Sequence, residues 1–116
     1  MGMGAEVSNV LLVTVDSLRV DAVGAYDDTA HTPVLDELAT RGTVFERAFA
    51  TGNWTPFSFP SLLASRPVFA DNGRIGVESA PTLAETVSNA GADTGGFNAA
   101  NGFLTGPWRY DAHFTE

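Results

Sequence analysis

A short apolar run at residues 10–15 (VLLVTV) constrains the fold of this chain more than any other stretch. The run is rich in β-branched residues and ends at Asp16. This length and composition are typical of a central parallel strand that is buried on both faces. The sequence therefore predicts a strand over residues 10–15 that places Asp16 at its carboxyl end.

Helix signals and strand signals alternate along the next part of the chain. Pro33 begins a helical pattern that Gly42 ends, and a second helix follows Pro56. Between the two helices, the apolar residues of segment 44–49 predict a short strand.

A third helix and a further strand are expected toward the C-terminus. The helix spans residues 82–90, with Ser79 or Pro81 as the cap at its start and Gly91 at its end. The strand follows at residues 94–97. This order predicts one α/β domain over residues 1–116, with a mostly parallel sheet flanked by helices and with ligands at the carboxyl ends of its strands.

The composition excludes several classes of protein. There are 14 acidic and six basic residues, the net charge is −8, and no basic stripe is available to bind nucleic acid. No cysteine is present, so disulfides and thiolate chemistry are excluded. All the basic residues are arginine; this acidic, lysine-free composition resembles that of haloarchaeal proteins and predicts a protein kept in solution in concentrated salt.

The N-terminal segment carries no targeting signal that we recognise. Residues 1–6 have no basic region, and the apolar run that follows is too short for a signal peptide or a membrane-spanning helix. A cytoplasmic protein without a membrane segment is expected.

Two polar side chains stand at positions where chemistry is expected. Asp16, at the end of the first strand, suits a hard or borderline cation, although a turn aspartate bonded to its own backbone fits equally well. Thr55 precedes Pro56 and an apolar run, so it is expected to cap a helix N-terminus. The unpaired N–H groups of that first turn would suit phosphate or sulfate, although capping alone also explains the pair.

Several segments together resemble the N-terminal part of sulfatases in the alkaline phosphatase superfamily. They occur in the family's order and spacing over nearly the whole chain: residues 9–19, 32–45, 54–67, 82–97 and 104–114. The resemblance implies the α/β sandwich of that superfamily. Because family members are several times longer, it also implies that the chain is a fragment truncated at its C-terminus.

The resemblance assigns roles to two of these residues. Asp16 matches a metal-binding aspartate, while Ser17 stands where many members have a second one. The nucleophile stands seven residues before the paired leucines of its helix, which places it at Thr55. The implied reaction uses a divalent ion (Ca, Mg, Mn or Zn) that activates the Thr55 hydroxyl for attack on sulfur or phosphorus.

The nucleophile segment departs from the sulfatase pattern. Sulfatases convert Cys or Ser within Cys/Ser-x-Pro-x-Arg to formylglycine, whereas here Phe57 and Phe59 replace that proline and arginine. No formylglycine is expected from threonine. Relatives with threonine nucleophiles are phosphodiesterases and phosphoglycerol transferases. Ser58 offers a second register, in which the leucine pair comes three residues too early.

The remaining site residues are incomplete. The family's Lys-x-His pair falls on Ala99 and Asn101, and Asn101 is either an oxyanion donor or a loop asparagine. Neither histidine, His31 nor His113, matches a family ligand. In the family the other metal ligands come from far downstream, so these 116 residues are expected to be inactive alone.

The sequence therefore predicts a sulfatase-like, metal-dependent hydrolase of small-molecule or glycan sulfate or phosphate esters, or a phosphoglycerol-type transferase. The alternative is a non-catalytic interaction module, or the remnant of a sulfatase-like protein. Such a module would associate with a partner or with itself through exposed sheet edges.

Overall fold

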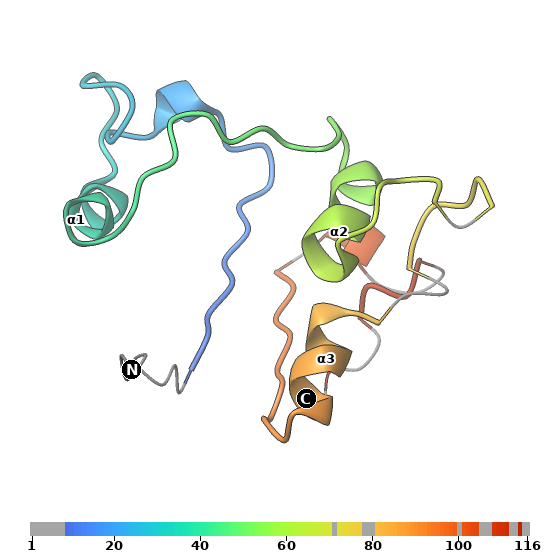
Figure 1. Cartoon of the computed structure of the whole chain (residues 1–116). Helices are drawn as coiled ribbons and strands as arrows, with labels where there is room; N and C mark the ends of the chain where they lie inside the picture. Colours follow the sequence, from blue (N-terminus) through green and yellow to red (C-terminus); the bar gives the residue numbers. More distant parts are fainter. Residues whose placement is uncertain are drawn as a thin grey trace, which may run out of the picture. The chain divides into compact units, whose positions relative to one another are not determined.

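Helices form the regular structure of the chain. The computed structural model describes residues 9–70, 72–77, 81–99, 101–104, 108–111 and 114. Its elements are η1 (Val20–Ala22), α1 (Pro33–Arg41), α2 (Thr55–Ala64), α3 (Leu83–Asn89) and η2 (Gly102–Leu104) (Figure 1). The chain divides into two compact units, Met1–Arg47 and Ala48–Glu116, and each is described by itself.

The predicted α/β fold with a mostly parallel sheet is wrong for this structure. Segments 10–15, 44–49 and 94–97 form no strand, and within the described ranges the β structure amounts to an isolated bridge at Arg74. Leu11, which was expected in a buried strand, is 88% exposed, and Phe49 of the second predicted strand is 87% exposed. A β-branched pattern favours an extended backbone, but a strand also needs a neighbour to complete its hydrogen-bond ladder. No such neighbour pairs with these segments in the described part of the chain.

Helix α1 confirms the prediction made from its terminal residues. Pro33 occupies the first helical position, where its missing N–H costs no hydrogen bond. The helix ends before Gly42, whose backbone N–H donates to the Leu38 carbonyl at 2.8 Å. These local signals set both ends without help from distant residues.

A polar contact joins the start of α1 to the loop before it. The Thr32 hydroxyl accepts from the Gly24 backbone N–H and donates to the Asp36 carboxylate, both at 2.8 Å. A Cβ atom on residue 24 would lie 2.5 Å from an Asp36 oxygen. A larger residue at position 24 would therefore require the Asp36 side chain to shift.

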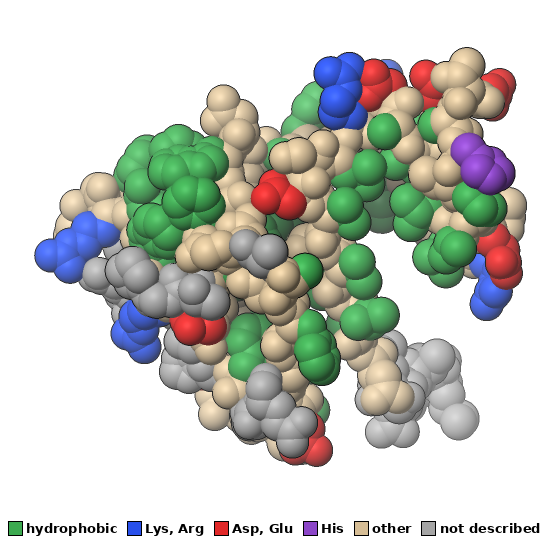
Figure 2. Space-filling view, turned by 180° about the vertical axis from the view of Figure 1, so that it is seen from behind, with side chains coloured by type: hydrophobic (Ala, Val, Ile, Leu, Met, Phe, Trp, Pro, Cys, Tyr) green, Lys and Arg blue, Asp and Glu red, His purple; other side chains and the backbone are tan. Residues whose placement is uncertain are grey.

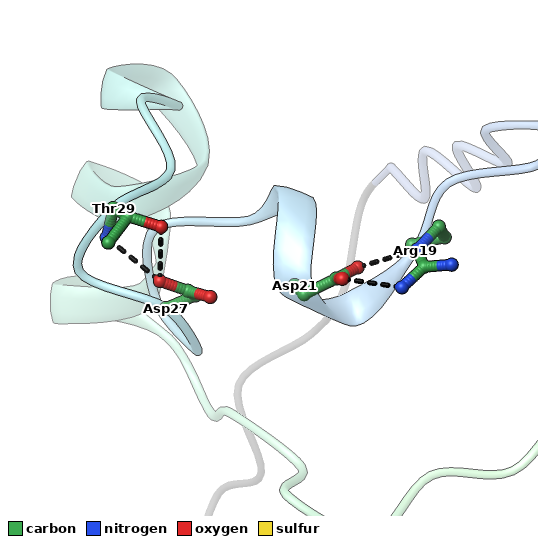
Figure 3. Close-up of polar contacts among 4 residues, drawn as sticks. All are labelled: Arg19, Asp21, Asp27 and Thr29. Atoms are coloured by element: carbon green, nitrogen blue, oxygen red, sulfur yellow. Dashed lines mark hydrogen bonds and ion pairs between the residues drawn. The ribbon is translucent and has the colours of Figure 1, made fainter.

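Two aspartates of the first unit form short-range contacts (Figure 3). Asp21 accepts two hydrogen bonds from the Arg19 guanidinium, at 2.6 and 2.8 Å, and this contact lowers the pKa of Asp21 and raises that of Arg19. Asp27 accepts from the backbone N–H and the hydroxyl of Thr29, and the hydroxyl bond is the main reason its pKa is lowered. Asp27 therefore stabilises the turn in which it lies, as an aspartate in a surface loop often does.

Helix α2 confirms the helix predicted after Pro56, but it begins one residue earlier than expected. Trp54 is the N-cap and Thr55 is the first helical residue. The helix ends at Ala64, and its C-cap Ser65 adopts a left-handed backbone (φ 51°) and donates its N–H to the Pro60 and Ser61 carbonyls. The capping role predicted for Thr55 is therefore wrong, and its hydroxyl is available for other contacts.

Helix α3 also forms where it was predicted, with a different cap. The Thr82 hydroxyl accepts from the Glu85 backbone N–H at 3.1 Å, which is an ordinary N-cap bond. The proposed cap at Pro81 is therefore wrong, and Ser79 lies outside the described residues. Gly91 follows the helix with φ at 91°, a left-handed conformation that favours glycine.

The core of the second unit surrounds α2, which contacts both α3 and η2 (Figure 1). Its buried residues are Pro56, Pro60, Gly76, Val77, Thr82, Ala84 and Tyr110. Elsewhere, hydrophobic side chains reach the molecular surface (Figure 2). Of the helices within the described ranges, none is both long and apolar enough to cross a lipid bilayer.

Candidate functional site

Thr55 lies at the start of α2 and contacts a residue that is distant in sequence. Its hydroxyl oxygen accepts a hydrogen bond from the side-chain amide nitrogen of Asn101 at 3.3 Å. Both side chains are partly buried. Two of the residues assigned to the site from sequence are therefore neighbours, although 46 positions separate them along the chain.

The amide of Asn101 is oriented by the turn that carries it. Its side-chain oxygen accepts from the Phe103 backbone N–H at 3.0 Å, so the amide nitrogen is the atom that faces Thr55. On the other side, the Asn101 backbone N–H donates to Asn98 at 3.0 Å and its carbonyl accepts from the Asn98 amide at 2.7 Å. These bonds present an N–H donor to the Thr55 oxygen in a fixed geometry.

Ser58, the second candidate nucleophile, lies one turn further along α2. Its hydroxyl donates to the Gly52 carbonyl at 2.8 Å and so joins the helix to the loop before it. This is a structural contact, and no side chain in the described ranges is placed against Ser58 as Asn101 is against Thr55. The geometry therefore distinguishes the two hydroxyls.

Gly52 allows the loop to approach α2 closely. A Cβ atom there would lie 2.5 Å from the Phe57 Cβ and 3.2 Å from the Phe57 carbonyl carbon, so backbone would have to move. Gly52→Ala is expected to lower the free energy of unfolding by about 1–3 kcal/mol, as overpacking does. Urea unfolding measures this change. Gly102→Ala is the matched control, because a Cβ at position 102 meets nothing within 4 Å, and equal losses in both variants would contradict the prediction.

Asp16 belongs to the first unit and is exposed there. It follows the extended segment 10–15, and one of its carboxylate oxygens accepts from the Ser17 hydroxyl at 3.4 Å. Ser17 has a left-handed backbone, with φ at 57°. Because Asp16 and Thr55 lie in different units, the pairing of metal ligand and nucleophile stays a prediction.

The residues present do not by themselves fit a metal centre. Among the residues that the structure describes, no group of three or more His, Asp or Glu side chains could hold a metal ion. His31 is exposed in the first unit, and His113 lies outside the described residues. A single aspartate falls short of the several protein ligands that a divalent site generally uses.

The sequence did not indicate a role for Tyr110, which contacts the first turn of α2 next to Thr55. Its hydroxyl donates to the Pro56 carbonyl at 2.9 Å, one residue after Thr55, and its side chain is 2% exposed. One signal was present in the sequence: Pro60 has no N–H for the carbonyl four residues before it. Nothing in the sequence indicated which residue would supply the replacement donor.

The comparison with protein families identifies the class of protein. The family model described as Sulfatase matches residues 8–111. The chain therefore belongs to the sulfatase family, a family of hydrolases that act on sulfate esters and generally use a divalent metal ion. Searches of curated proteins and of solved structures gave no significant match.

Proposed function

We propose that this chain carries the nucleophile of a sulfatase-like ester hydrolase, and that the nucleophile is Thr55. The supporting observation is the hydrogen bond from the oriented Asn101 amide to the Thr55 hydroxyl oxygen. A donor in that position stabilises negative charge on the oxygen as the hydroxyl loses its proton.

The proposed reaction is substitution at sulfur or phosphorus. The Thr55 oxygen forms a bond to the central atom, and the bond from that atom to the ester oxygen breaks. The hydroxyl proton passes to solvent, and the leaving alcohol takes up a proton. Water then releases sulfate or phosphate from Thr55; in a phosphoglycerol-type transferase a second alcohol takes the place of water. Threonine carries out this chemistry without conversion to formylglycine.

Trapping the covalent intermediate tests this assignment. An active preparation, defined by metal-dependent turnover, is incubated with 4-nitrophenyl phosphate or 4-nitrophenyl sulfate and quenched in acid. Mass spectrometry of the peptide that spans α2 is expected to place the phosphoryl or sulfuryl group on Thr55. A group on Ser58 would contradict the assignment, and the better of the two esters would define the substrate class.

Asn101 offers a second test of the same site. Asn101→Ala removes the N–H donor to the Thr55 oxygen and is expected to lower kcat by about 10–10²-fold, since a hydrogen bond to a charged oxygen contributes about 1.5–3 kcal/mol. Asn101→Asp should lower kcat at least as strongly, because a carboxylate places negative charge against the Thr55 oxygen. Steady-state kinetics measures both variants. An unchanged kcat in Asn101→Ala would contradict the role of Asn101.

We further propose that Asp16 is one ligand of a divalent ion and that these 116 residues alone are inactive. Asp16 is the single metal ligand that the family resemblance assigns, so no catalytic step is attributed to the ion here. The chain is assayed with both 4-nitrophenyl esters and with Ca²⁺, Mg²⁺, Mn²⁺ or Zn²⁺. Turnover above that of Thr55→Ala would contradict the proposed inactivity, and it would support the nucleophile.

A non-catalytic interaction module is the second candidate, and the exposed apolar side chains favour it. Leu11, Phe49 and Phe97 are among the large hydrophobic residues at the surface. Because the described residues form no sheet, sheet edges are not the contact surface, and a second copy of the chain would bind these side chains directly. Light scattering after size exclusion would show a dimer or larger assembly, and a stable monomer would contradict this candidate.

Adaptation to concentrated salt and a cytoplasmic location are proposed from composition. With a net charge of −8, raising KCl from about 0.1 to 2 M is expected to screen repulsion and raise the melting temperature by about 5–10 °C. Thermal unfolding measures this shift. Replacing two exposed aspartates, Asp28→Asn and Asp93→Asn, should reduce this rise in melting temperature, and full stability without salt would count against the proposal.

Fractionation of the source cells tests the proposed cytoplasmic location.

A further inference from the structure

The first turn of α2 has a gap in its hydrogen bonding that the sequence creates. In an α-helix, the carbonyl of residue 56 accepts from the N–H of residue 60. Residue 60 is a proline, which has no N–H, and it lies inside the helix. The Pro56 carbonyl therefore lacks its ordinary helical donor at the turn that carries Thr55.

Tyr110 supplies a donor at this carbonyl from 54 residues away. Its hydroxyl donates to the Pro56 oxygen at 2.9 Å, and the bond is buried. Pro56 and Pro60 are themselves fully buried, so water has little access to the carbonyl. An unsatisfied carbonyl in such a place is costly, and the phenol removes that cost.

Tyr110 is well placed for this contact because its own segment is held. The Val77 backbone N–H donates to the Trp108 carbonyl at 3.2 Å, and Gly76 lets the two backbones approach, since a Cβ there would lie 2.8 Å from that same oxygen. The Tyr110 ring also packs against Phe59 of α2, with ring centroids 5.8 Å apart. The position of the Tyr110 hydroxyl is therefore fixed by the backbone contact of its segment and by the packing of its ring.

We propose that Tyr110 is a positioning residue for Thr55: its hydroxyl takes the place of the N–H that Pro60 lacks and fixes the first turn of α2. The catalytic meaning of this contact rests on the proposed function of Thr55. The contact itself does not, since it concerns the backbone of the turn. A shift of that turn would move the Thr55 hydroxyl relative to the Asn101 amide, which α2 does not carry.

A double-mutant cycle between Tyr110→Phe and Pro60→Ala tests the proposal. Alanine at position 60 restores the N–H for the Pro56 carbonyl, so the phenol should matter less in that background. Hydrogen exchange is measured by NMR on the intact chain at the Phe57 and Ser58 amides, which donate to the Trp54 carbonyl in this turn. The Thr86 amide of α3 and the amide of Ala90, the C-cap of that helix, serve as the internal reference.

Tyr110→Phe is expected to speed exchange at Phe57 and Ser58 by about tenfold and to leave the α3 amides within about twofold. In the Pro60→Ala background, the same substitution should change the α2 amides by less than about threefold. The Asn101 side-chain amide resonance should shift in Tyr110→Phe and return in the double variant. Tyr26→Phe is the matched control, because the Tyr26 hydroxyl also donates to a backbone carbonyl, that of Phe45 in the other unit.

Three results would overturn the proposal: equal acceleration in α2 and α3, an undiminished effect of Tyr110→Phe in the Pro60→Ala background, or an unmoved Asn101 resonance. Circular dichroism confirms that each variant is folded. Since these measurements use no substrate, their outcome is independent of whether Thr55 is the nucleophile. Turnover in Thr55→Ala, measured on an active, metal-dependent preparation, decides that question separately.

Discussion

Replacing Thr55 with alanine is expected to lower turnover of a sulfate or phosphate ester by at least about 10³-fold, because loss of a nucleophile removes the covalent route. The fall should appear in kcat, while KM changes little, since the Thr55 oxygen reacts with the ester and is not its main binding contact. Steady-state kinetics of an active, metal-dependent preparation measures both constants. The size of the effect separates a nucleophile from a residue that only shapes the helix terminus.

Two further variants make this result specific. Thr55→Ser keeps the hydroxyl and its hydrogen bond from Asn101, so it should retain part of the activity. Ser58→Ala removes a hydroxyl from the same helix and breaks only the bond to the Gly52 carbonyl, so its kcat should fall by about tenfold at most. If Ser58→Ala were inactive and Thr55→Ala active, the other register of the motif would be correct.

The helices could be predicted from sequence because their signals are local. Pro33 and Gly42 limit α1 through the geometry of one turn at each end, and no distant residue takes part. The cap of α3 was misplaced for a related reason. Both Pro81 and Thr82 suit a helix start, and only the backbone decides that the Thr82 hydroxyl accepts from Glu85.

The sheet could not be predicted in the same way. The apolar, β-branched pattern at segment 10–15 indicates a preference for an extended, buried backbone, which is only part of what a strand needs. The other part is a partner that supplies donors and acceptors from elsewhere in the chain. In the described residues that partner is missing, so Leu11 and Phe97 are left at the surface.

For the candidate site as well, the sequence predicted individual residues but not the contacts between distant residues. The family resemblance indicated Thr55, through its spacing to the leucine pair, and it also indicated Asn101, but only the fold could show that their side chains meet across 46 residues. Tyr110 could not be assigned at all from its own neighbours. The Pro56–Pro60 spacing indicates that the Pro56 carbonyl lacks its helical N–H donor. Which residue replaces that donor depends on a contact that spans 54 residues.

Tyr110 also makes the second unit sensitive to high pH, and the composition of the chain makes this testable. Burial raises the pKa of Tyr110 to about 12, whereas the pKa of a tyrosine in an unfolded chain is about 10. Because the folded-state pKa is the higher one, the stabilisation is fully present below about pH 10 and is lost as the pH rises through about 12. The difference corresponds to roughly 2–3 kcal/mol in the free energy of unfolding.

The free energy of unfolding is measured by urea titration between about pH 9 and 12. The chain has no lysine and no cysteine, so neither of these side-chain types contributes to the pH dependence in this range. Tyr110→Phe should therefore lose most of the pH dependence, and Tyr26→Phe should keep it. Ionised Tyr110 cannot donate to the Pro56 carbonyl and places a charge against it. The free energy of unfolding should therefore fall over the same pH range in which the first turn of α2 shifts around Thr55. A Tyr110→Phe variant with an unchanged slope would show that this phenol does not hold the turn.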